Sequence, residues 1–111
     1  MTYSRELPHE IDVTLKNDEA YIHSSAGVVI CALTPEAGTS DDLITVSSRI
    51  RSQVIYFKPA SGCTITVKNT GNIKATGAGG TALIMDGQYD DFSGVWDGTY
   101  FRQTGRNNNP A

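Results

Sequence analysis

The sequence carries little charge, and neither sign is concentrated in one stretch. Charged residues make up 19% of its 111 residues, against about 25% in ordinary soluble domains. The nine lysines and arginines are dispersed along the chain and the formal net charge is −3, so no basic surface is predicted and nucleic acid is not expected as a partner. Uncharged polar side chains should cover much of the surface, which can therefore pack against protein at a low desolvation cost.

Long apolar runs are also missing. No apolar stretch approaches the roughly 20 residues that a membrane helix needs, so no membrane partner is expected. The first ten residues, MTYSRELPHE, lack the basic-then-apolar layout of a signal peptide. We therefore expect the chain to be made and folded in a cytosol.

Cysteine is scarce, and its placement argues against metal binding. Cys31 and Cys63 lie far apart and outside any CxxC or Cys/His cluster. In a reducing compartment, buried free thiols are favoured over a disulfide between them.

Helical periodicity is absent, so helix content should be close to nil. Short segments rich in β-branched and aromatic residues are present instead, and in many of them apolar and polar residues alternate. In IDVTLK, for example, Ile11, Val13 and Leu15 share one face, as in a strand packed on a core from one side. Such segments predict strands at residues 11–16, 20–24, 27–33, 43–47, 53–58, 64–68, 73–76, 81–85, 92–96 and 99–103.

Residues that favour turns separate these segments. Asp97 and Gly98 lie between GVW and TYF, an arrangement that predicts a hairpin with a two-residue turn. No internal repeat is evident. The sequence predicts one all-β domain over residues 11–105, preceded by an arm at residues 1–10 and followed by a polar tail at residues 106–111.

No group of residues predicts catalysis. His9 and His23 fall outside any spacing that binds a metal or activates a nucleophile. The adjacent pairs Asp41-Asp42 and Asp90-Asp91 could bind calcium or, across a cleft, work as acid and base. Adjacent aspartates point in different directions and no acidic ladder follows either pair, so solvated turn residues are the favoured interpretation. The glycine-rich residues 77–80 lack the Lys-Ser/Thr of a phosphate loop. We expect no enzyme, no cofactor and no metal.

Aromatic residues are concentrated in the last third of the chain. Trp96 and Phe101 are expected in the core, whereas core and surface are about equally favoured for Tyr89 and Tyr100. If exposed on a β-platform, Tyr89, Trp96 or Tyr100 could stack on a sugar ring beside Asp90 and Asp91.

Four segments carry a resemblance to a known class of proteins. They are IDVTLK, then VVICALTPEAGTSDDLITVSS, then QVIYFKPASGCTITVKNTGNIKATG, and finally GQYDDFSGVWDGTYFRQTG. Their order over residues 11–105 resembles a small all-β module of tailed-bacteriophage virion proteins, among them head-decorating and fibre-associated ones.

The resemblance implies an antiparallel β-sandwich or jelly-roll-like barrel that assembles as a homotrimer on the virion surface. The leading hypothesis is a capsid decoration, cement or head-fibre protein that binds the capsid lattice. Its N-terminal arm would contact neighbouring capsid subunits through Tyr3, Leu7 and Pro8. The alternative is a carbohydrate- or receptor-binding adhesin domain of a tail fibre or spike, with Tyr89, Trp96 and Tyr100 as stacking residues.

Overall fold

The computed structural model describes residues 9–108. Within this range the chain forms eleven strands and no helix, which confirms the all-β prediction. The strands are β1 (His9–Thr14), β2 (Glu19–Ile22), β3 (Val28–Thr34), β4 (Ser40–Leu43), β5 (Thr45–Ser48), β6 (Gln53–Pro59), β7 (Thr64–Lys68), β8 (Ile73–Lys74), β9 (Thr81–Met85), β10 (Asp91–Trp96) and β11 (Phe101–Asn107). The strands begin two residues before and end two residues after the predicted 11–105 domain.

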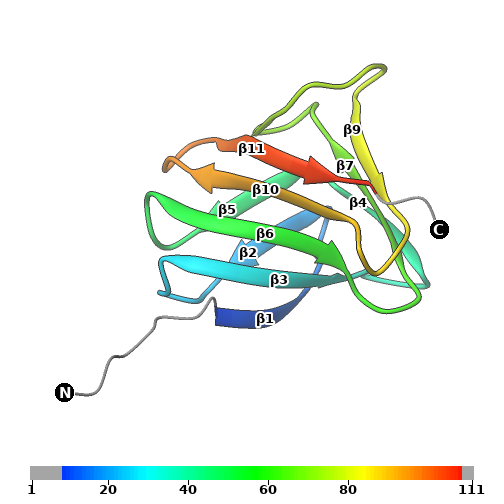
Figure 1. Cartoon of the computed structure of the whole chain (residues 1–111), viewed down its shortest axis with the longest axis horizontal. Helices are drawn as coiled ribbons and strands as arrows, with labels where there is room; N and C mark the ends of the chain where they lie inside the picture. Colours follow the sequence, from blue (N-terminus) through cyan, green and yellow to red (C-terminus); the bar gives the residue numbers. More distant parts are fainter. Residues whose placement is uncertain (1–8, 109–111) are drawn as a thin grey trace.

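The chain coils into a small β-solenoid of about three turns with mostly parallel strands (Figure 1). Strands β1, β3 and β6 lie parallel in the first sheet, β2 pairs in parallel with β5, and β4 pairs in parallel with β7. The predicted antiparallel β-sandwich or jelly-roll-like barrel is wrong. Consecutive strands such as β3, β4 and β5 belong to three different sheets, so each strand pairs with one from the next turn.

Strands β9 and β10 reverse direction at the C-terminal end of the solenoid. Strand β9 runs antiparallel to β7, β10 runs antiparallel to β6, and β11 returns antiparallel to β10 to pair with β8. The six-stranded sheet therefore has the order β1-β3-β6-β10-β11-β8. The reversed strands cover the edges of β7 and β6, while β8 and β9 become the edge strands at this end.

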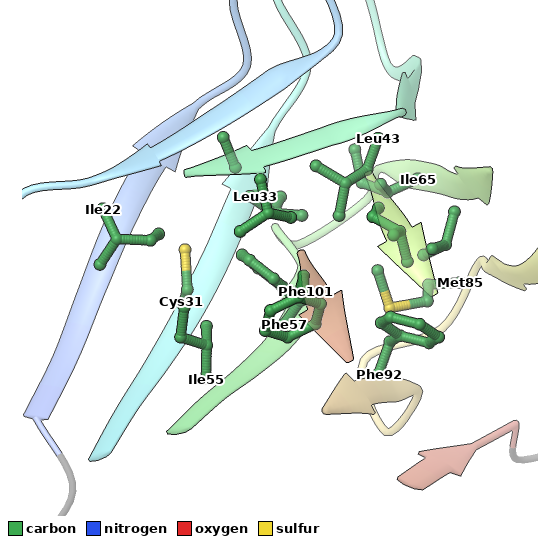
Figure 2. Close-up of a cluster of buried hydrophobic side chains, with 14 of the residues drawn as sticks. Ile22, Cys31, Leu33, Leu43, Ile55, Phe57, Ile65, Met85, Phe92 and Phe101 are labelled. Atoms are coloured by element: carbon green, nitrogen blue, oxygen red, sulfur yellow. The ribbon is translucent and has the colours of Figure 1, made fainter. Parts of the chain in front are cut away.

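The core lies inside the coil and follows from the alternation of side chains. In β3 the inward residues are Val29, Cys31 and Leu33, and in β6 they include Ile55 and Phe57, all fully buried. Figure 2 shows Cys31, Leu33, Ile55 and Phe57 converging with side chains from the other sheets and from β10 and β11. The capping strands are therefore packed on the same core as the coils.

Both cysteines are free. Cys31 lies in the core, and its burial, together with the charge of Asp12, raises the pKa of its thiol to about 12. Cys63 is partly exposed. The expectation of free thiols is thus confirmed, although only Cys31 is buried.

Two side-chain amides join successive turns. Gln53, which is fully buried, donates from Nε2 to the carbonyl oxygens of Ser24, at 2.9 Å, and Ala26, at 2.7 Å. Asn72 donates from Nδ2 to the carbonyl oxygen of Val46, at 2.7 Å, and its Oδ1 accepts the amide N–H of Val46, at 2.9 Å. Asn72 thus takes the place of a strand partner beside β5, and both amides satisfy backbone groups at corners of the coil.

The predicted hairpin at Asp97 forms, but its turn is longer than expected. Trp96 pairs with Phe101, so four residues connect β10 and β11, not two. The Oδ1 atom of Asp97 accepts the backbone N–H groups of Thr99, at 2.9 Å, and Tyr100, at 2.7 Å. These bonds and the Arg102 guanidinium lower the pKa of Asp97 to about 2.

Candidate functional site

An open groove of about 590 Å³ lies on the outer face of the first sheet. Its lining comes from β1, β3 and β6, from the loop between β9 and β10, and from the nearby ends of β10 and β11. The volume falls within the range of about 300 to 1,000 Å³ that is typical of ligand sites. Strands distant in sequence build this groove because the coil places β1, β3 and β6 side by side (Figure 1).

The floor of the groove is apolar because outward positions of the central strands carry apolar side chains. Val28 and Ile30 of β3 and Tyr56 of β6 point outward, since their neighbours in each strand are buried in the core. The register aligns Glu10, Ile30 and Tyr56 in one row across three strands. Tyr56 is 41% exposed, so one ring stands in the centre of an accessible sheet face.

A second tyrosine stands at the rim on a loop that is held in place. Tyr89 is 69% exposed. The buried carboxylate of Asp90 accepts the backbone N–H groups of Asp86, at 2.9 Å, and Gly87, at 3.0 Å. From β11, Asn107 donates its amide Nδ2–H to the carbonyl oxygen of Tyr89, at 3.2 Å. The backbone that carries this exposed ring is therefore fixed from two sides.

The polar residues of the groove are mixed in charge, with carboxylates in excess. Glu10 and Asp91 line it together with Lys58, and Gln88 and Asn107 contribute amides. Burial and the neighbouring Asp90 carboxylate raise the pKa of Asp91. The groove thus offers hydrogen-bond donors and acceptors around an apolar floor.

The structure separates the three predicted stacking residues. Tyr89 lines the groove, whereas Trp96 is only 7% exposed and packs in the core, so it is not available to stack on a ligand. Tyr100 lies in the β10–β11 turn, where the Lys74 ammonium sits 4.5 Å from its ring centroid. The predicted arm residues Tyr3, Leu7 and Pro8 lie outside the described residues.

Tyr56 was missed, although the sequence contains a signal for it. In QVIYFK, Ile55 and Phe57 share the face that the structure buries, and Tyr56 alternates with them. An aromatic residue on the outward face of a strand points to a contact surface, but its proximity to Tyr89 depends on the fold.

The other groups considered from the sequence have local structural roles. Asp41 accepts the backbone N–H groups of Glu36 and Asp42, each at 2.8 Å. Desolvation raises the pKa of Asp41, but these two bonds and a side-chain hydrogen bond with Asp18 together lower it. The ring of His23 packs at 4.4 Å from that of Tyr21. Over residues 9–108, no three His, Cys, Asp or Glu side chains are grouped so that they could hold a metal ion. No helix able to cross a membrane occurs in the same range.

Comparison with known proteins finds no family model, curated protein or solved structure that matches the chain. Its function is therefore inferred from the fold, the groove and the order of the sequence segments.

Proposed function

We propose that the protein is a structural component of a tailed-bacteriophage virion, and that it catalyses no reaction. In this proposal it is a capsid decoration or head-fibre protein that binds the capsid lattice at the virion surface after synthesis in the host cytoplasm. Two observations support the proposal. The first is the resemblance of its segment order to phage virion modules, although the antiparallel sandwich that this resemblance implies is wrong, and the second is the unpaired edge of β1 beside the N-terminal arm.

The observation that carries the proposal is the open edge of β1 at the N-terminal end of the solenoid. Strand β1 pairs only with β3, so, like the strands β8 and β9 at other sheet edges, it has no second partner strand within residues 9–108. Ile11 and Val13 of β1 are only partly buried and pack against the core. A strand edge beside a partly covered core is a surface that another protein can cover by strand addition.

The position of the predicted arm fits attachment at this end. Residues 1–8 precede β1 directly in the sequence, so we propose that the predicted arm attaches the protein near this edge. Many copies on a lattice can bind stably even when each contact is weak, because attachment is multivalent.

The proposal is tested by locating the chain on particles. The chain is supplied with a C-terminal epitope tag during growth of the phage that encodes it, and purified particles are labelled with gold for electron microscopy. We expect label on the capsid with the full chain and with a variant lacking residues 109–111. Deletion of residues 1–8 should remove the label while the β-sheet circular dichroism spectrum is kept. Particles unlabelled by the full chain, or labelled equally by the variant lacking residues 1–8, would contradict the proposal.

We also propose that three copies associate. The low charge of the chain favours packing against other copies, and Tyr21 on β2 and Ile84 on β9 are exposed apolar side chains outside the groove. Native mass spectrometry should give a particle of three times the 11.9 kDa chain mass. A monomer that persists at the highest concentration reached would refute the trimer.

A further inference from the structure

We propose that the groove on the outer face of the first sheet binds a neutral saccharide, with Tyr56 and Tyr89 as stacking residues. This inference goes beyond the structural role proposed above and does not depend on it. It would give the protein a binding activity separate from that role, the recognition of glycans.

The first step is the exposure of Tyr89 on a fixed loop. A ring that is 69% exposed presents most of its surface to a ligand. The Asp90 carboxylate and the Asn107 amide hold the backbone of this loop with three hydrogen bonds. An aromatic side chain on an already ordered backbone loses less conformational entropy on ligand binding than one on a backbone that must first become ordered. This is the property expected of a binding residue.

The second step is the combination of surfaces in the groove. The apolar floor of Val28, Ile30 and Tyr56 suits the C–H face of a sugar ring. The rim carries Asp91, Gln88 and Asn107 as well as Glu10 and Lys58, which together donate and accept hydrogen bonds. Sugar hydroxyl groups both donate and accept hydrogen bonds. A saccharide can therefore pack its C–H face on the apolar floor while its hydroxyl groups bond to the polar side chains of the rim.

Other ligand classes fit the groove less well. An anionic ligand would meet the carboxylates of Glu10 and Asp91 with Lys58 as the one basic side chain among the lining residues. A purely apolar ligand would strip water from these polar groups without replacing their hydrogen bonds. A peptide strand cannot add to the floor, because β3 and β6 are each paired on both sides.

The test uses an array of immobilised neutral oligosaccharides, probed with the fluorescently labelled full chain. We expect the chain to bind at least one neutral glycan, whose soluble form is then titrated by calorimetry. Replacing Tyr89 with alanine should weaken that binding about tenfold or more, because truncating an aromatic residue that is central to a contact typically costs at least this factor. Asp91→Asn, which keeps the shape of the side chain, should weaken it less.

Tyr100→Ala is the matched control, because Tyr100 is 36% exposed but lies outside the groove. The affinity of this variant for the glycan should stay within about twofold of that of the original chain, well below the loss expected for Tyr89→Ala. Thermal melting of each variant verifies that the fold is kept.

The proposal is overturned if no neutral glycan binds, or if Tyr89→Ala and Tyr100→Ala have the same effect. It is also overturned if Tyr89→Ala keeps glycan binding and instead loses trimer formation or particle labelling. Labelling of particles by a Tyr89→Ala chain that no longer binds glycan would leave the structural role intact.

Discussion

Replacing Phe101 with alanine should lower the free energy of unfolding by about 3 to 5 kcal/mol, as expected when a fully buried phenylalanine leaves a cavity. Phe101 opens β11 and is completely buried. Its ring centroid lies 5.3 Å from that of Phe57 and 6.1 Å from that of Phe92, so it touches both the coil and the cap (Figure 2). Its backbone N–H also donates to the carbonyl oxygen of Asn72, at 3.0 Å. Urea denaturation followed by circular dichroism measures the loss.

Tyr100→Ala provides the neighbouring control. The Tyr100 ring is partly exposed and its recorded ring contacts are with the cations of Lys74 and Arg102, so its removal should cost less than about 1 kcal/mol. If both substitutions had similar small effects, the cap formed by β10 and β11 would not be packed on the coil, and the described core would be incorrect.

Side-chain alternation in the sequence identified most strands and their inward faces. The alternation in TITVK places Ile65 and Val67 together, and both are fully buried in β7. The segment LITVS, predicted as one strand, is two, because the chain turns a corner at Ile44. There the backbone N–H groups of Ile44 and Thr45 both donate to the carbonyl oxygen of Asp18. Such a bond between turns leaves no signal in local sequence.

The arrangement of the strands could not be predicted in the same way. Alternation shows which face of a strand is buried but not which strand lies beside it, and Gly- and Asn-rich turns suit both hairpins and solenoid corners. The repeat is also irregular. Residues paired across β1 and β3, such as His9 and Val29, are 20 positions apart, whereas Val28 and Val54 across β3 and β6 are 26 apart. Unequal turns hide the periodicity that reveals longer solenoids.

The candidate site was predicted only in part for the same reason. Tyr89 was selected because it is aromatic and near Asp90 and Asp91, and it does line a groove. Trp96 is a stacking candidate only if exposed, and the core position that the sequence favours for it is confirmed, because the inward face of β10 buries it. The groove joins positions from Glu10 to Asn107, so its composition follows from the coil and not from any one segment.

The substitution Gly94→Ala, which adds one methyl group, should lower the free energy of unfolding by at least about 3 kcal/mol. This value is in the upper part of the range for overpacked cores. Gly94 lies in the centre of β10, at a register shift in its pairing with β11. A Cβ atom there would overlap the carbonyl oxygen of Arg102 and lie 2.8 Å from the Cε2 and Cζ atoms of Phe101. Neither neighbour can move freely, because β11 is paired on both sides and the Phe101 ring is enclosed.

Gly27→Ala is the matched control, since no atom lies within 4 Å of the added Cβ and its backbone is not left-handed. It should change stability by less than about 1 kcal/mol in either direction. The double variant Gly94→Ala with Phe101→Leu identifies the main obstacle. The Arg102 carbonyl oxygen is the nearer atom and belongs to the paired backbone, so a smaller side chain at position 101 should not remove the main overlap. We therefore expect Gly94→Ala to lower the free energy of unfolding by nearly the same amount in the Phe101→Leu background as in the original chain. Complete relief of this destabilisation would assign the clash to the aromatic ring and show that β11 can shift away from β10.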